Sequence, residues 1–158
     1  MNKINIIFID NWTRESVMND PQYIYIFTDN LSRTSGKNEG EMFNNWYAEY
    51  WGGPWYCYPN TTQAVIRGLH NAFPITTMRD PYKNQLEDKD FELIRNTWEK
   101  ECGMIREASK NYLGVKCSPY QFGNGTYSRL TPLLFNTLSW FLWEYLGIDN
   151  SGPILRLV

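Results

Sequence analysis

The first part of the chain alternates short apolar runs with polar turns. Ile4–Ile9 is rich in β-branched residues and ends at the polar pair Asp10-Asn11, which is typical of a strand followed by a turn. Beyond a second turn at 19–21, every position of Tyr23–Phe27 is aromatic or β-branched. Such a run predicts a buried strand.

Further along, apolar positions take helical spacing. Asp88–Asn111 carries a stripe three or four residues apart, which predicts an amphipathic helix; its members are Phe91, Ile94, Trp98, Cys102 and Ile105. Thr131 and Pro132 predict the start of another helix, because threonine caps helices and proline is tolerated in their first turn. Gly147 predicts its end.

Shorter segments complete the element order. Gln63–His70 fits a short helix, while Ile75–Met78 and Gly114–Pro119 fit short strands. Ser151–Val158 fits either an edge strand or a loose end. The alternation of strands and helices predicts a single α/β domain over residues 1–158, built on a mixed β-sheet flanked by helices.

A long polar stretch separates the second strand from this short helix. We interpret residues 31–62 as an aromatic-rich insertion, with a short helix over Glu41–Tyr50. Long loops in small domains are usually functional or mobile. The tryptophans Trp46, Trp51 and Trp55 suit a lid that stacks on a base, or equally a surface for a partner protein.

Composition and charge argue against several classes of partner and site. The net charge is −2, with 15 basic and 17 acidic residues, which makes nucleic acid an unlikely partner. His70 is the sole histidine, so we expect no metal site, and no cofactor is indicated. Three cysteines without CxxC spacing indicate free thiols and a cytoplasmic location. No apolar run reaches membrane-spanning length.

Polar residues follow three of the predicted strands, and we expect these strand ends, Thr28–Arg33, Thr76–Arg79 and Gln121–Arg129, to meet at one edge of the sheet, where α/β proteins bind ligands. Asp29 and Asn30 follow the second strand, Thr76 and Thr77 end the third, and Gly123–Thr126 follows the fourth. Glycines let backbone N–H groups approach an anion closely, and arginines bind phosphate. The simpler interpretation is ordinary turn and capping chemistry. The predicted ligand-binding residues are Asn30, Arg33, Gln63, Arg67, Thr76, Thr77, Gly123, Asn124, Gly125 and Thr126.

Two stretches carry a resemblance to a known group of proteins. Tyr25–Asn30 with Arg33, followed by Gln63–Gly68 and Asn71–Thr77, is similar to an uncharacterised family of phage and bacterial proteins. In that family a strand ends in Phe-Gly-Asp-Asn, and a Gly-x-Gly-Thr loop precedes a C-terminal helix. Its layout looks macrodomain-like, which implies binding of ADP-ribose or a related nucleotide. Thr28 departs from the pattern, since it stands where the family has glycine.

We therefore expect a phage-type domain that binds a phosphate-bearing nucleotide, either to sequester it or to hydrolyse it without metal. Asp29 is the best candidate for a general base. The alternative is a non-enzymatic protein that inhibits a host defence protein by direct contact. In that case Trp46, Trp51 and Trp55 would form the partner surface.

Overall fold

Four parallel strands form the centre of the protein. The computed structural model describes residues 3–31, 63–79, 84–125 and 128–151. Within these residues the strands are β1 (Ile6–Phe8), β2 (Tyr23–Asn30), β3 (Ala72–Met78) and β4 (Gly114–Cys117), in the order β1-β4-β2-β3. Each neighbouring pair runs parallel. The α/β class is confirmed, but the predicted mixed sheet is wrong, because connections such as the one through α3 (Phe91–Ala108) return the chain to the same end of the sheet.

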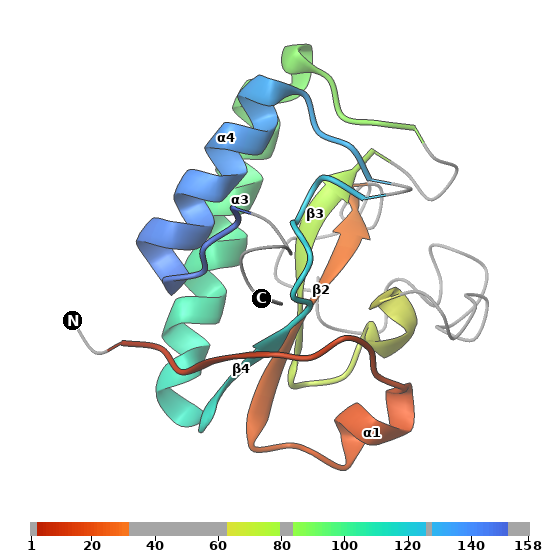
Figure 1. Cartoon of the computed structure of the whole chain (residues 1–158), viewed down its shortest axis with the longest axis vertical. Helices are drawn as coiled ribbons and strands as arrows, with labels where there is room; N and C mark the ends of the chain where they lie inside the picture. The colour runs from red at the N-terminus through yellow and green to blue at the C-terminus, as the bar shows by residue number, and fades with distance from the viewer. Residues whose placement is uncertain (1–2, 32–62, 80–83, 126–127, 152–158) are drawn as a thin grey trace.

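Two long helical segments cover one face of the sheet. They are α3 and α4 (Pro132–Phe141), the latter continued by one π-helical turn, η7 (Leu142–Leu146). Figure 1 shows α3 and α4 lying side by side against the strands. The main core fills this layer, and its largest fully buried side chains include Trp98, Ile24, Ile26, Ile75, Ile94, Ile105, Leu134 and Leu138.

A smaller layer covers the opposite face. It comprises α1 (Arg14–Met18) and the 3-10 turn η4 (Gln63–Ile66), packed on a second core around Val17, Tyr25 and Phe27. Arg14 joins the two segments, since its Nη1 donates to the carbonyl oxygen of Val65 in η4 at 3.1 Å, and also to that of Arg67 at 2.7 Å. Strands with helical segments on both faces explain why β2 is almost continuously buried.

Both predicted long helices are confirmed. A 3-10 turn, η5 (Asp88–Asp90), precedes α3, and another, η6 (Ser109–Asn111), follows it, so the segment spans the predicted range. At the start of α4, the Thr131 hydroxyl accepts a hydrogen bond from the Leu134 N–H at 3.3 Å. Gly147 ends the last turn with a left-handed φ of 70°.

The short elements differ from the prediction. The expected short helix over Gln63–His70 is confirmed only for its first half, as the 3-10 turn η4, because Gly68 turns the chain with a φ of 90°. β3 begins at Ala72, three residues before the predicted start, and includes Pro74. In an edge strand, the backbone N–H and carbonyl groups of alternate residues point away from the neighbouring strand. Pro74 is one of these residues of β3, so its missing N–H removes no hydrogen bond to β2.

Some predicted features lie outside the described residues: the helix over Glu41–Tyr50, the residues Arg33, Trp46, Trp51, Trp55 and Thr126, and the tail from Gly152 onward. Among the described helices, none combines the length and the apolar character needed to cross a membrane.

Candidate functional site

The structure brings the predicted polar residues of β2 and β3 together. Asp29 lies opposite Thr76, and a β-bulge then places Asn30 opposite Met78, with Thr77 as the extra residue. Bulges are common beside binding sites because they re-aim side chains. The carboxyl ends of parallel strands, where these residues lie, are also the usual position of ligand sites in open α/β sheets.

Asp29 and Arg67 form a buried ion pair at this edge. The Arg67 Nε donates to Asp29 Oδ2 at 2.9 Å, and Nη2 donates to Oδ1. The side chain of Asp29 is 0% exposed and that of Arg67 is 2% exposed. Asp29 also accepts from the backbone N–H of Asn30 at 2.9 Å. These contacts give the Asp29 carboxylate the environment of a structural ion pair, remote from solvent.

Gln63 is held by a backbone contact. Its Oε1 accepts a hydrogen bond from the Thr28 N–H at 3.0 Å, which joins η4 to β2. Its carbonyl oxygen accepts from the indole N–H of Trp12 at 3.3 Å. Gln63 therefore helps to position Arg67, four residues further along, above the end of the sheet.

Thr76 is bound to a residue that the sequence pattern did not single out. Its N–H and hydroxyl donate to the two carboxylate oxygens of Glu101, at 2.9 and 2.7 Å, and Glu101 is 1% exposed. The Trp98 indole N–H donates to the Thr76 carbonyl oxygen at 2.7 Å. The sequence offered one indication of this contact, because Glu101 is a charged residue that lies beside the apolar stripe of α3.

Backbone hydrogen bonds join residues 121–125 to residues 128–130. Gly125 N–H donates to the Ser128 carbonyl oxygen, and Leu130 N–H donates to the Gly123 carbonyl oxygen, both at 2.8 Å. Asn124 and Arg129 form an antiparallel bridge between the two segments. We call the two joined segments, residues 121–125 and 128–130, the glycine hairpin. Because the Gly125 amide is already bonded within the hairpin, it is not aimed outward as in a phosphate-binding nest.

The two glycines of this hairpin have different roles. Gly123 has a φ of 81°, and a β-carbon there would lie 2.4 Å from Leu130 Cδ1. Close packing on Leu130 therefore requires glycine at this position. At Gly125 the nearest atom among the described residues would be 4.0 Å away, so these residues leave this position open.

The glycine hairpin lies against the end of β3. The Ser128 hydroxyl donates to the Thr77 carbonyl oxygen at 3.3 Å, and the Arg129 N–H donates to Gln85 Oε1 at 2.9 Å. Asn150 anchors the other end of the hairpin, since its side chain bonds both the N–H and the carbonyl of Phe122, at 2.8 and 3.1 Å. The predicted convergence of the three strand ends is therefore observed for the described residues.

The arginines at this edge differ in their availability. Arg67 is buried against Asp29, and Arg79 donates to Asp90 at 2.6 Å. Arg129 is exposed at the glycine hairpin and has no ion pair among the described residues. Of these three, Arg129 is the exposed arginine without an ion pair to a described residue, so its charge is the most available to a ligand.

Other reactive groups are less suited to catalysis. Burial, with a smaller contribution from the neighbouring Glu101, raises the pKa of the Cys102 thiol, which keeps it protonated. Cys102 and Cys117 are both buried, and Cys57 lies outside the described residues. In the described part of the chain, no cluster of three or more His, Cys, Asp or Glu residues could hold a metal ion.

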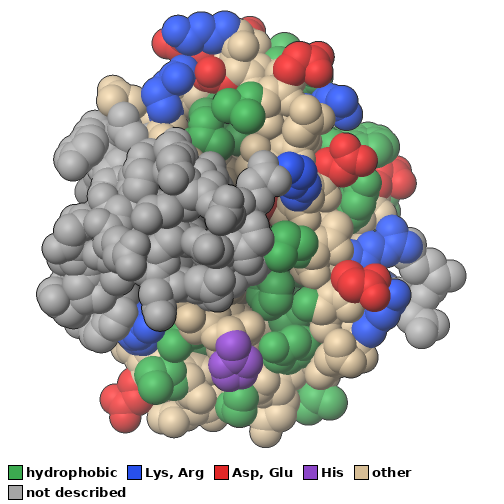
Figure 2. Space-filling model, turned by 180° about the vertical axis from the view of Figure 1, so that it is seen from behind, with side chains coloured by type: hydrophobic (Ala, Val, Ile, Leu, Met, Phe, Trp, Pro, Cys, Tyr) green, Lys and Arg blue, Asp and Glu red, His purple; other side chains and the backbone are tan. Residues whose placement is uncertain are grey.

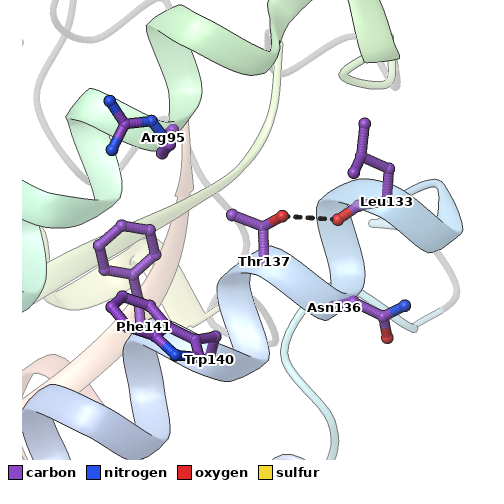
Figure 3. A pocket seen from close by; sticks show the side chains of 6 residues that line it. All are labelled: Arg95, Leu133, Asn136, Thr137, Trp140 and Phe141. Atoms are coloured by element: carbon purple, nitrogen blue, oxygen red, sulfur yellow. Dashed lines mark hydrogen bonds between the residues drawn. The ribbon is translucent and has the colours of Figure 1, made fainter.

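A shallow groove of about 330 Å³ lies elsewhere, between α3 and α4. Figure 3 shows Arg95 facing Phe141 and Trp140 across it, while Thr137 donates to the Leu133 carbonyl oxygen. Figure 2 draws the face of the molecule opposite to that of Figure 1, and basic and acidic side chains are interspersed over the described part of this face. The visible part of this face therefore lacks the basic patch that nucleic-acid binding requires.

Fold and contacts define a three-layer α/β protein with a polar, hydrogen-bonded edge at the carboxyl ends of its strands. The chain belongs to a family of unknown function, DUF7831, whose model matches residues 7–139. No curated protein and no solved structure matches the chain.

Proposed function

We propose that this protein binds a phosphate-bearing, nucleotide-like ligand at the carboxyl edge of its sheet. The observation that carries the proposal is the meeting of β2, β3 and the glycine hairpin at that edge. Open parallel sheets bind ligands beyond the carboxyl ends of their strands. Arg129 supplies an exposed guanidinium that can bind a phosphate bidentately.

Binding without turnover fits the contacts better than hydrolysis does. A general base must reach the proton that it abstracts, directly or through one water molecule. Asp29 is buried and paired with Arg67. We therefore assign to Asp29 the role of holding Arg67 and the strand ends, with sequestration of the ligand as the activity. The resemblance to a macrodomain-like family makes ADP-ribose the first ligand to test.

Calorimetric titration tests this proposal. The panel comprises ADP-ribose, NAD, cyclic mono- and dinucleotides, and mononucleotides. We expect micromolar or tighter binding of one class, at least tenfold weaker in Arg129→Gln. Gly125→Trp should block the ligand, because its side chain begins in open space. Arg95→Gln, on the α3–α4 groove, should bind as wild type. If no compound of the panel binds, the proposal is rejected.

A second candidate is inhibition of a host protein by direct contact. Trp140 and Leu133 are 55% and 46% exposed on α4, and exposed apolar side chains of this size favour a partner surface. Replacing Trp51 and Trp55 together, or Trp140 alone, should abolish capture of that partner and leave nucleotide titrations unchanged. Loss of nucleotide binding in the same variants would contradict separate surfaces.

A further inference from the structure

The outer side of α4 and η7 carries exposed apolar side chains. Leu133 is 46% exposed and Trp140 is 55% exposed. Because these two are seven residues apart, about two helical turns, they lie on the same side of the helix. Trp143, in the next turn, is 59% exposed. Large exposed apolar side chains that gather on one element mark a site of protein contact.

One basic side chain borders this apolar surface. Arg95 of α3 lines the groove between α3 and α4, and Figure 3 shows it facing Trp140 and Phe141. Among the described residues Arg95 forms no ion pair, and this includes Glu92 and Glu99, its acidic neighbours along α3. Its charge is therefore available to an acidic side chain that a partner brings to the groove.

The position of Arg95 along α4 follows from the direction of the two helices. The Thr131 hydroxyl donates to Asp88 where both helical segments begin, and a β-carbon at Gly103 would lie 4.0 Å from the Tyr145 ring. α3 and α4 therefore run parallel. Arg95 comes about midway between these two contacts along α3, so it is level with the middle of α4.

An acidic side chain lies further along the same side of the helix. Glu144 is exposed and follows Trp140 by four residues, about one helical turn. It forms no ion pair with a residue that the structure describes. Arg95 and Glu144 therefore lie on opposite sides of Trp140 along the helix. We call this surface the α4 face; on α4 and η7 it comprises Leu133, Asn136, Thr137, Trp140 and Glu144.

We propose that the α4 face is an interface between two copies of this chain, in which the two α4 helices pack antiparallel about Trp140. A two-fold axis brings each residue after Trp140 level with the residue equally far before it in the other copy. Glu144 then lies level with Asn136 of the second copy, beside that copy's Arg95. Each dimer contains this ion pair twice, on either side of a central tryptophan contact, and buried tryptophans often dominate binding energy.

A second copy fits the α4 face because the charges of this face are complementary to themselves. An unrelated partner needs an acid for Arg95 and a base for Glu144 at matching positions, whereas a two-fold axis supplies both from the same chain. The net charge of −2 adds little repulsion between copies. The α4 face is also distinct from the carboxyl edge of the sheet, so the dimer does not rest on the proposed nucleotide binding.

Sedimentation equilibrium at micromolar concentrations tests the dimer. We expect the wild type to approach twice the mass of one chain and Trp140→Asp to stay monomeric with an unchanged circular dichroism spectrum. Arg95→Glu and Glu144→Arg should each weaken dimerisation by about tenfold or more, since each brings like charges together twice. Glu15→Arg reverses an exposed acid of α1, on the other face of the sheet, and should dimerise as wild type.

Exchanging the two charges provides the sharpest test. Arg95→Glu combined with Glu144→Arg should restore dimerisation, because the ion pair forms again with its signs reversed. These charge variants decide the question if Trp140→Asp unfolds. A wild-type chain that stays monomeric would overturn the proposal, as would a folded Trp140→Asp that still dimerises or a double variant without recovery. Capture of a host protein by a monomer, lost in Trp140→Asp, would assign the α4 face to that protein instead.

Discussion

At the scale of single residues, the ion pair of Asp29 and Arg67 should be the most sensitive contact of the carboxyl edge. Both charges are buried. Removing one partner leaves the other charge desolvated, so Arg67→Met should lower the free energy of unfolding by about 3–5 kcal/mol. Adding Asp29→Asn should recover part of the loss. Urea unfolding measures both, and a cost below about 1 kcal/mol for Arg67→Met would contradict a buried pair.

The two glycines of the hairpin form a matched pair for a second prediction. Gly123→Ala should destabilise the protein by about 2 kcal/mol or more, because the new methyl group meets Leu130 and alanine disfavours a positive φ. Gly125→Ala should change stability by less than about 0.5 kcal/mol. Thermal unfolding of both variants tests this. Equal losses of stability in the two variants would show that the Leu130 side chain moves to make room for the new methyl group.

Asp20 should make stability depend on acid pH. Tyr25 and Lys116 each donate to its Oδ2 at 2.6 Å. Burial alone would raise the pKa of Asp20, but these hydrogen bonds and the lysine charge outweigh burial and hold the pKa below its usual value of 3.8. A lowered folded-state pKa gives stability that is present above the unfolded-state value and is lost as pH falls through the folded-state value.

Lys116→Met should therefore lower stability at pH 7, by at most about 1 kcal/mol because the pair is partly exposed, and should flatten the decline at acid pH. Lys110→Met is the control, since Lys110 pairs with Glu107 on the surface. Urea unfolding at several pH values from neutral to strongly acid measures both. An acid decline as steep as in wild type would disprove the role of Lys116.

At the scale of elements, α3 protects the open edge of β3. Glu101 and Trp98 bond the outward N–H and carbonyl of Thr76, which an edge strand would otherwise leave unpaired. Glu101→Leu should cost about 3 kcal/mol, because it leaves the buried Thr76 amide and hydroxyl without an acceptor. Glu101→Gln should cost less, since its oxygen can still accept from the amide.

Amide hydrogen exchange provides a second measurement of this edge. The Thr76 N–H should exchange markedly faster in Glu101→Leu than in wild type, with smaller changes in the central strand β2. Unchanged protection at Thr76 would mean that Glu101 contributes only packing.

The elements differ in how well the sequence pattern predicted them. α3 and α4 are long enough for a repeating apolar stripe and have recognisable ends, so both were predicted. α1 has five residues, too few for a periodic signal, although Thr13 and Ser16 form a capping box at its start. Asp29, Asn30 and Thr76 were expected at one edge and lie there, but their partners Arg67 and Glu101 depend on packing.

At the scale of the whole molecule, the two cores share one sheet. Val17 lies in the α1 layer and Leu138 in the α4 layer, and both are fully buried. Since β2 contributes to both layers, Val17→Ala and Leu138→Ala should each shift one common unfolding transition, Leu138→Ala by about 2–5 kcal/mol and Val17→Ala by less. Circular dichroism and tryptophan fluorescence should give coincident curves. Separate transitions would show that the layers unfold independently.

The sequence by itself determined the α/β class, the central buried strand, the two long helices and the polar strand ends, because periodicity and turn residues are local properties of the chain. Tertiary structure decided the parallel strand order and the partners of the polar groups. Asp29 and Arg67 are 38 residues apart in the chain, and Thr76 and Glu101 are 25 apart. Contacts over such separations depend on how the layers pack, which no local pattern encodes.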